Sequence, residues 1–213
     1  MTRRTADAAP TSAADGGSGP LPGPALLVVC TGNVCRSPAA EALIRVAVGS
    51  GSGLTVSSAG TRALVGRPVE PPMARLLVER GARPGRAVAR QLVAGDVAAA
   101  DLVLTAEPAH RSAVVTLQPR AVRRTFTLLE FVDLAEHALD AATAEPPRGP
   151  TARLAWMLTR VPQIRPLRTA AASAAITDPF GQDDACYREV VGVVADAVHR
   201  LVAVLDAGSA PIG

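Results

Sequence analysis

The sequence predicts an α/β fold in which helices cover both faces of a parallel sheet. Strand-like and helix-like segments alternate along the chain, which is the pattern of parallel strands joined by crossover helices. The 213 residues are within the ordinary size of one globular domain, and 48% of them are hydrophobic, which is enough for one core. Because only 2% are aromatic, we expect a core of Val, Leu and Ala side chains.

Four short apolar segments are the candidate strands: residues 26–30, 54–57, 102–105 and 124–128. Helix candidates lie between them at residues 39–48, 70–80 and 108–116, and two more follow the fourth strand. The last helix, predicted at 187–205, carries one apolar stripe formed by Val190, Val193, Val194, Ala197, Leu201 and Val204. Open α/β sheets bind ligands at the carboxyl ends of their strands, so we expect the functional site there.

The first strand runs directly into a loop whose residue types suit phosphate binding. It reads Cys-Thr-Gly-Asn-Val-Cys-Arg-Ser-Pro from residue 30 to residue 38. Gly32 and Asn33 are residue types that accept positive φ, and we expect Ser37 to cap the next helix with Pro38 as its first residue. The backbone N–H groups of residues 31–36 can then point inward as an anion-binding nest at a helix N-terminus.

Cys30 and Arg36 are the candidate catalytic pair of this loop. The planar guanidinium of Arg36 can hold two oxygens of a tetrahedral oxyanion, and the same ring of donors stabilises a thiolate at Cys30. The alternative is a buried strand cysteine followed by a surface arginine. All 22 basic residues are arginine, so the Cys-x5-Arg spacing alone is weak. The agreement of strand, turn, cap and the amphipathic run at 39–46 favours the catalytic interpretation.

The loop resembles that of the low-molecular-weight protein tyrosine phosphatases, whose pattern is Cys-x-Gly-Asn-x-Cys-Arg-Ser-Pro. Further segments resemble the same family in the same order: Ser-Ala-Gly-Thr at 58–61, Ala-Arg-Gln-Leu at 89–92, Asp-Leu-Val-Leu-Thr at 101–105, and Asp-Pro-Phe-Gly at 178–181. The resemblance covers roughly residues 25 to 206. It implies a three-layer sandwich with a four-stranded parallel sheet in the order 2-1-3-4.

The resemblance also implies hydrolysis of a phosphate monoester without a metal or another cofactor. Cys30 attacks phosphorus in line, Arg36 holds the equatorial oxygens, and Asp178 protonates the leaving oxygen and then activates water. Ser37 donates a hydrogen bond to Cys30 as it departs, while Asn33 and Ser58 support the loop from behind. The loop residues implied to surround the substrate phosphate are Thr31, Gly32, Asn33, Val34, Cys35 and Ser37.

The assignment of Asp178 as the general acid has alternatives. Asp before Pro is a common turn former, so Asp178-Pro179 by itself predicts only a loop, and Asp183 and Asp184 are rival acids close by. The aromatic Phe180 and the position just before the last helix favour Asp178. The three histidines, His110, His137 and His199, lie on predicted helices and are expected to be surface or packing residues.

The walls of the loop determine the leaving group. Phe180 and Leu64 can enclose a flat aryl group, which favours a phosphotyrosine protein as substrate, with inorganic phosphate as product or inhibitor. The resemblance implies that family members preferring phosphoarginine have Thr at position 34, where Ile or Val accompanies phosphotyrosine. Val34 has no hydroxyl to bind a guanidinium or activate water. Phosphotyrosine is therefore the predicted substrate, and phosphoarginine is the alternative.

Other functional classes fit less well. Arsenate reductases share the fold and loop, but they need further cysteines to relay a disulfide, and Cys186 alone is a poor candidate. A phosphotyrosine-binding adaptor would not require both Cys30 and Asp178. The pI near 9.2 permits nucleic-acid binding, but the arginines are dispersed and aromatic side chains are few, so we expect no nucleic-acid partner.

The sequence also predicts the domain organisation and the cellular location of the protein. Residues 1–24 lack apolar periodicity and are predicted to be a disordered tail before a phosphatase domain at 25–213. No stretch has the length of a transmembrane helix, and a thiolate nucleophile needs a reducing compartment, so we expect a cytoplasmic protein that binds no membrane. Cys35, five residues from Cys30, is a candidate partner in a reversible disulfide.

Compared with the family that it resembles, the chain has a longer connection before Asp178, which we expect to be a basic insertion at about 146–177. It contains no Asp or Glu and carries Arg148, Arg153, Arg160, Arg165 and Arg168. One interpretation is a solvated insertion with a short helix at 151–160, anchored by Leu154, Trp156 and Leu158. The other is a flap that steers anionic substrates toward the loop.

Overall fold

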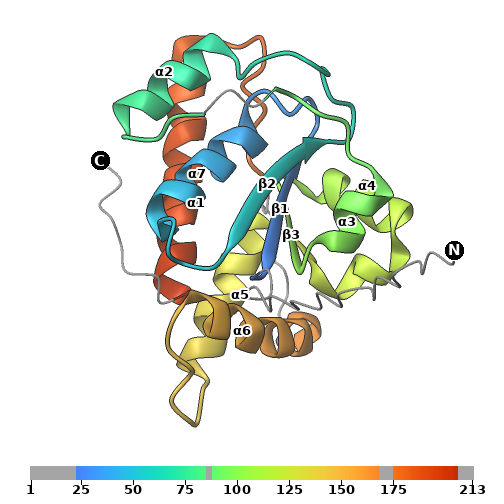
Figure 1. The fold of residues 1–213 in the computed structure, drawn as a ribbon, viewed down its shortest axis with the longest axis vertical. Helices are drawn as coiled ribbons and strands as arrows, with labels where there is room; N and C mark the ends of the chain where they lie inside the picture. Colours follow the sequence, from blue (N-terminus) through green and yellow to red (C-terminus); the bar gives the residue numbers. More distant parts are fainter. Residues whose placement is uncertain (1–22, 85–87, 168–174, 206–213) are drawn as a thin grey trace, which may run out of the picture.

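A four-stranded parallel sheet forms the centre of the molecule (Figure 1). The computed structural model describes residues 23–84, 88–167 and 175–205. The strands are β1 (Ala25–Cys30), β2 (Thr55–Gly60), β3 (Leu102–Thr105) and β4 (Thr125–Thr127), in the order β2-β1-β3-β4. The predicted α/β class and the strand order 2-1-3-4 are confirmed.

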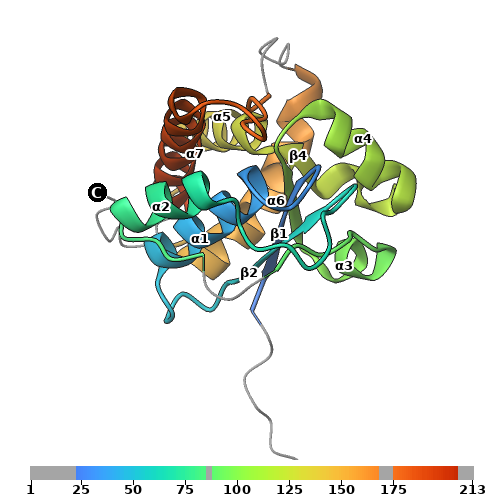
Figure 2. The ribbon, with the colours of Figure 1, turned by 90° about the horizontal axis from the view of Figure 1, so that it is seen from above.

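Helices cover both faces of the sheet (Figure 2). One face is covered by α1 (Arg36–Val48), α2 (Pro71–Glu79), α5 (Leu128–Asp140) and α7 (Asp184–Val204). The helix α6 (Pro150–Ile164) joins the same hydrophobic core through its contact with α5. The other face packs against α3 (Ala94–Ala99), α4 (Pro108–Leu117) and the 3-10 helix η1 (Pro119–Arg124). Alternate residues of β1 feed the two cores, since Leu26 and Val28 join the first and Leu27 and Val29 the second.

The predicted elements are present with shifted ends. β2 continues to Gly60 instead of ending at residue 57, because Ser58, Ala59 and Gly60 pair with the last three residues of β1. The helix at 151–160 is longer than predicted, and α3 was not among the predicted helices. On the apolar stripe of α7 only Val193 is partly exposed, while the other five residues are buried.

The strands all point the same way, so the residues that follow β1, β2 and β3 meet at one edge of the sheet. Gly60 ends β2 against the loop that follows Cys30, and a Cβ at this position would collide with the carbonyl oxygen of Thr31. This close approach requires glycine. The segment at 61–70 then lies along the loop and binds it through backbone hydrogen bonds.

The helix α6 lies at the opposite end of the strands, where β1 and β2 begin (Figure 1). Its first turn is tied to that end by Thr151, whose Oγ1 donates to the carbonyl oxygen of Ser52 at 3.2 Å. The expected tail at 1–24 lies, apart from its last two residues, outside the described residues. Within the described ranges, no helix combines the length and apolar character needed to cross a bilayer.

Candidate active site

The loop after β1 turns its carbonyl oxygens outward. The amides of Arg62, Leu64 and Glu70 donate to the carbonyls of Thr31, Gly32 and Val34, with N···O distances of 3.0, 3.0 and 2.9 Å. No backbone bond among the described residues uses an N–H of residues 32–35 as its donor. These N–H groups therefore stay available to an anion, which is the property of a nest at a helix N-terminus.

Asn33 holds the turn of the loop. It is the loop residue with positive φ, at 56°, whereas Gly32, whose type also accepts positive φ, does not adopt it. One left-handed residue is enough to reverse the chain, and the Asn33 side chain stabilises it. Its Nδ2 donates to Ser37 Oγ at 3.0 Å and to Ser58 Oγ at 2.8 Å, and its Oδ1 accepts from the amide of Arg90 at 2.9 Å. Asn33 and Ser58 thus lie behind the loop as expected.

Ser37 faces the cysteine instead of capping the helix. Its Oγ lies 3.0 Å from the Sγ of Cys30. The prediction that Ser37 is the N-cap was wrong, because α1 begins at Arg36 with Cys35 in the capping position. Pro38 consequently lies in the first turn, where its missing N–H costs no helical bond. The early start turns the Ser37 hydroxyl inward, within reach of the nucleophile candidate.

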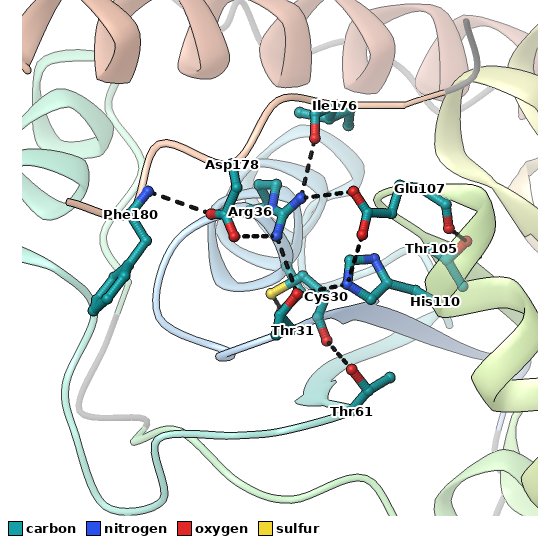
Figure 3. Close-up of polar contacts among 11 residues, drawn as sticks. Cys30, Thr31, Arg36, Thr61, Thr105, Glu107, His110, Ile176, Asp178 and Phe180 are labelled. Carbon is teal, nitrogen blue, oxygen red and sulfur yellow. Dashed lines mark hydrogen bonds and ion pairs between the residues drawn. The ribbon is translucent and has the colours of Figure 1, made fainter. Parts of the chain in front are cut away.

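Arg36 is buried in the first turn of α1 and bridges the site (Figure 3). Its Nη2 donates to Asp178 Oδ2 at 2.7 Å and to Thr31 Oγ1 at 3.3 Å. Its Nη1 donates to the carbonyl of Ile176 at 3.1 Å and lies 3.4 Å from Glu107 Oε2. The Nε atom is buried with no partner among the described residues. A bidentate oxyanion can therefore take Nε directly and compete with Asp178 for Nη2.

Asp178 is the carboxylate that reaches the loop. It follows Ile176, whose amide donates to the carbonyl of Ala106 just after β3 and so anchors this segment to the sheet edge. The rival acids have other roles: Asp183 caps α7 by accepting from the Cys186 amide, and Asp184 pairs with Arg75 on α2. The structure brings Asp178, but neither rival, to Arg36.

A cavity of about 150 Å³ opens above Cys30. Its lining consists of Cys30, Thr31, Gly32, Val34, Cys35, Arg36, Arg62, Leu64, Asp178 and Phe180. Leu64 and Phe180, the two residues predicted to enclose an aryl group, both line this cavity, and Val34 adds to its apolar surface. Phe180 is 44% exposed, and the guanidinium of Arg67 lies 5.9 Å from the centre of its ring. The opening combines an anion-binding floor with a wall suited to a flat group.

His110 and Glu107 belong to the site and were missed. His110 was expected to be a surface or packing residue, but it is 3% exposed and its Nε2 lies 2.8 Å from Thr31 Oγ1 and 3.4 Å from Glu107 Oε1. Burial is the main cause that lowers the pKa of His110. The position of Glu-x-x-His directly after a parallel strand was the available signal, because such residues gather at the carboxyl edge.

Cys35 is buried in the loop and contacts Tyr187 of α7. Its Sγ–H donates to the hydroxyl of Tyr187 at 3.9 Å, and burial raises the pKa of the Cys35 thiol to about 12. Burial also raises the pKa of Tyr187 to about 12. Cys186 lies in the first turn of α7 and packs against the core, as expected. Cys35 is therefore a neutral thiol at neutral pH.

The arginines of the insertion make contacts away from the loop. Arg165 pairs with both carboxylate oxygens of Glu130 at 2.7 Å, while Arg148 pairs with Glu145. Arg160 lies over the ring of Trp156, and Arg153 Nε donates to the carbonyl of Pro147. Arg168 lies outside the described residues. Leu154, Met157 and Val161 bury one side of α6, which favours the packing interpretation of this segment.

Comparison with known proteins identifies the family. The model of the family described as "Low molecular weight phosphotyrosine protein phosphatase" matches residues 25–164, which contain the whole loop. The chain belongs to this phosphatase family. The matched residues end before Asp178, so the low molecular weight phosphatase model does not cover the acid candidate. Its contact with Arg36 is the observation that links Asp178 to the site.

Individual relatives agree with this membership. The chain is 35% identical over 113 residues to "Probable low molecular weight protein-tyrosine-phosphatase EpsP" of Ralstonia nicotianae, covering 52% of this chain and 76% of the relative. It is 34% identical over 125 residues to the protein-arginine-phosphatase of Geobacillus stearothermophilus, covering 59% and 80%. The crystal structure of the Erwinia amylovora tyrosine phosphatase AmsI shares the fold, with a TM-score of 0.60 at 23% identity over 85% of this chain and 92% of that one.

Within the described part of the chain, no group of three or more His, Cys, Asp or Glu side chains is arranged to hold a metal ion. The positive groups that face the cavity are instead Arg36 and Arg62. Together with the loop amides they can stabilise the negative charge of a bound phosphoryl group.

Proposed function

We propose that this member of the family hydrolyses phosphotyrosine in proteins through a cysteinyl-phosphate intermediate on Cys30. The observation that carries the proposal is the position of Cys30 at the end of β1, on the floor of a cavity formed by the loop and the buried Arg36. The substrate phosphoryl group accepts from the loop amides and from Arg36 Nε, which has no other partner among the described residues. The loop therefore acts as a phosphate-binding loop.

In the first step the Cys30 thiolate forms an S–P bond as the P–O bond to the tyrosyl group breaks. Asp178 gives its proton to the departing phenolic oxygen, so tyrosine leaves as the neutral phenol. The phosphate competes with the Asp178 carboxylate for Arg36 Nη2, which frees Asp178 to face the leaving group. Ser37 Oγ, 3.0 Å from Cys30 Sγ, donates to the sulfur and stabilises its negative charge.

In the second step a water attacks phosphorus and the S–P bond breaks. Asp178, now a carboxylate, takes the proton from that water, inorganic phosphate is released and Cys30 returns to the thiolate. Arg36 and the loop amides hold the three equatorial oxygens in both steps, which is where charge develops. The same residues serve both half-reactions, so no further group is required.

The walls support an aryl leaving group. Phe180 and Leu64 line the opening, and an aromatic ring fits between these apolar side chains. Phosphoarginine is the alternative, because one relative is a protein-arginine-phosphatase. Val34 favours phosphotyrosine, since its side chain lines the cavity without a hydroxyl that could bind a guanidinium. We propose the cytoplasm as the location, because a thiolate nucleophile needs a reducing compartment.

Activity on p-nitrophenyl phosphate at mildly acidic pH in the presence of EDTA tests the class of enzyme. We expect turnover by the wild type and none by Cys30→Ser. A thiol-dependent reduction of arsenate without phosphatase activity would contradict the proposal. The substrate is tested by the ratio of kcat/KM on a phosphotyrosine peptide to that on a phosphoarginine peptide of the same sequence, which we expect to exceed one.

A further inference from the structure

The side chain of Thr31 occupies a position that the proposed mechanism does not use. Its Oγ1 lies 3.3 Å from Arg36 Nη2, which can only donate, and 2.8 Å from His110 Nε2, which can donate or accept. A hydroxyl has two lone pairs and one proton. The direction of the bond to His110 therefore decides where the Thr31 proton points.

The surroundings of the imidazole assign that direction. His110 Nδ1 is buried and has no hydrogen-bond partner among the described residues, so a proton there would be a buried, unpaired donor. The Nε2 atom faces two oxygens instead, Thr31 Oγ1 at 2.8 Å and Glu107 Oε1 at 3.4 Å. A lone pair at Nε2 would point at the Glu107 carboxylate and be repelled. The neutral ring therefore carries its proton on Nε2 and donates to Thr31.

With both lone pairs of Thr31 Oγ1 engaged, by Arg36 and by His110, its own proton must be donated elsewhere. No other acceptor for it lies within hydrogen-bond distance among the described residues, and Thr31 lines the cavity above Cys30 (Figure 3). Among the described residues this leaves the cavity as the side where the proton can find an acceptor, which is water when the cavity is empty and an oxygen of the ligand when one is bound.

We propose that His110 and Glu107 are positioning residues that set Thr31 as a hydrogen-bond donor to a phosphoryl oxygen of the bound substrate. We call this chain of hydrogen bonds from Glu107 through His110 to Thr31 the relay. Glu107 contacts both groups that bind Thr31, since its Oε1 lies 3.4 Å from His110 Nε2 and its Oε2 lies 3.4 Å from Arg36 Nη1. Its backbone is tied to β3, because Thr105 Oγ1 donates to the Glu107 carbonyl at 3.2 Å. The proposal deepens the proposed phosphatase function and rests on it.

The relay is tested by the binding of inorganic phosphate, measured by calorimetry, which does not depend on turnover. Thr31→Val removes the hydroxyl and keeps the shape of the side chain, while Thr31→Ser keeps the hydroxyl. We expect phosphate binding and kcat/KM on p-nitrophenyl phosphate to fall about tenfold or more in Thr31→Val and to be largely retained in Thr31→Ser. Equal values for the two variants would overturn the proposal.

His110 is tested by a second pair of variants. His110→Gln keeps an N–H near the position of Nε2, whereas His110→Leu removes it. We expect Leu to weaken phosphate binding and Gln to restore it, and we expect His110→Leu to have no further effect in a Thr31→Val background, because His110 acts through Thr31. If the Thr31 hydroxyl donated to His110 instead, His110→Leu would release it and phosphate binding would be unchanged or tighter.

A direct readout is independent of both variants. The nitrogen chemical shifts of the His110 ring in the wild-type protein report which atom is protonated, and we expect the proton on Nε2. A proton on Nδ1 would contradict the relay even if the protein is an active phosphatase. The opposite outcome is also informative. If the wild type were inactive, but His110 were protonated on Nε2 and the Thr31 and His110 variants changed phosphate binding as expected, the proposed function would be rejected and the relay would stand.

Discussion

Arg36 carries more of the site than its place in the loop suggests. Two carboxylates, from Asp178 and Glu107, share one buried guanidinium, and the carbonyl of Ile176 accepts from the same nitrogen that faces Glu107. The Arg36–Asp178 contact joins the nucleophile loop to a segment 142 residues away in sequence. Because Asp178 is about half exposed although Arg36 is buried, solvent screens the pair from the carboxylate side, and we expect a bound phosphate to displace Asp178 from Arg36.

The contact predicts that Asp178 has two separable effects. In Asp178→Asn, kcat on phenyl phosphate should fall about 10²- to 10⁴-fold, because the leaving group is no longer protonated. Inorganic phosphate should inhibit the same variant up to about fivefold more tightly, because Arg36 Nη2 loses a charged competitor. Steady-state kinetics with phosphate as inhibitor measures both. Unchanged kcat would reject Asp178 as the acid, and Asp183→Asn serves as the control.

His110 predicts a dependence of stability on pH. Burial lowers its pKa, and Arg36 and Arg62 act in the same direction while Glu107 and Asp178 oppose it. Below the ordinary histidine pKa, the unfolded chain binds a proton that the folded chain does not. The free energy of unfolding therefore falls as the pH is lowered through that pKa, by at most about 1.4 kcal/mol per pH unit. Urea unfolding at pH 7.5 and 5.5 should show a smaller loss for His110→Gln than for wild type. Equal losses would contradict the assignment.

Cys35 remains a predicted partner of Cys30 in a protective disulfide. Because burial raises the pKa of Cys35 to about 12, its thiolate fraction at neutral pH is small and rises about tenfold per pH unit. After peroxide treatment, recovery of activity by thiols should be greater for wild type than for Cys35→Ser, and the difference should grow from pH 7 to pH 9. If wild type and Cys35→Ser recovered the same activity at pH 7 and at pH 9, Cys35 would not form a protective disulfide with Cys30.

At the scale of elements, the end of β2 and the segment after it shape the loop. Gly60 ends the strand under the Thr31 carbonyl, and the next ten residues bind three loop carbonyls. The backbone of residues 61–70 thus holds the carbonyl side of the loop, and the Asn33 side chain ties the loop to Ser37 and Ser58. The amides of the loop remain free to face the cavity. Such a preorganised ring of donors needs no rearrangement when charge develops on the phosphoryl group.

The Gly60 contact predicts a large effect from one methyl group. Gly60→Ala should displace the Thr31 carbonyl, destabilise the protein by about 1–3 kcal/mol and lower kcat/KM by about tenfold or more. Gly192→Ala is the matched control, because a Cβ on this residue of α7 meets nothing within 4 Å. It should leave activity unchanged and raise stability by about 0.5–1 kcal/mol. Denaturant unfolding and kinetics of both variants test the contrast.

At the scale of the molecule, charge around the site is separated from charge on the insertion. The chain has a formal net charge of +3. Arg62 lines the cavity and makes no ion pair within the described residues, whereas Arg165 is bound to Glu130 and lies 4.5 Å from the centre of the Phe126 ring. These contacts tie Arg165 to α5 and β4. We therefore expect attraction of an anionic substrate to depend on Arg62, beside the loop, more than on the insertion.

This separation predicts how salt affects substrate capture. The kcat/KM for an anionic phosphate ester should fall with ionic strength with the same slope in wild type and in a variant with Arg148→Ala and Arg160→Ala. Arg62→Ala should flatten the slope, because this guanidinium lies at the opening. Rates measured between 20 and 500 mM salt, on the order of the range over which screening changes, test this. A flatter slope in the insertion variant would revive the steering interpretation.

Much of the fold and part of the site could be read from local sequence. The alternation of apolar segments predicted the class of the sheet, and the run from Cys30 to Pro38 predicted the loop, since strand, turn and helix start are set by neighbouring residues. The positive φ of Asn33 belongs to this local information. The ends of the elements could not be predicted locally. β2 extends to Gly60 because it pairs with β1, and α1 starts at Arg36, one residue before Ser37, which contacts the sulfur of Cys30.

The sequence by itself determined that the chain folds into a parallel α/β sheet and presents a Cys-x5-Arg loop at the end of its first strand. Only the tertiary structure decided which acid meets Arg36, that His110 and Glu107 belong to the site, and that α6 lies at the far end of the strands. The reason is that these contacts join segments far apart in the chain. A local pattern can place a residue at the end of a strand, but it does not record which side chains then touch across the edge of the sheet.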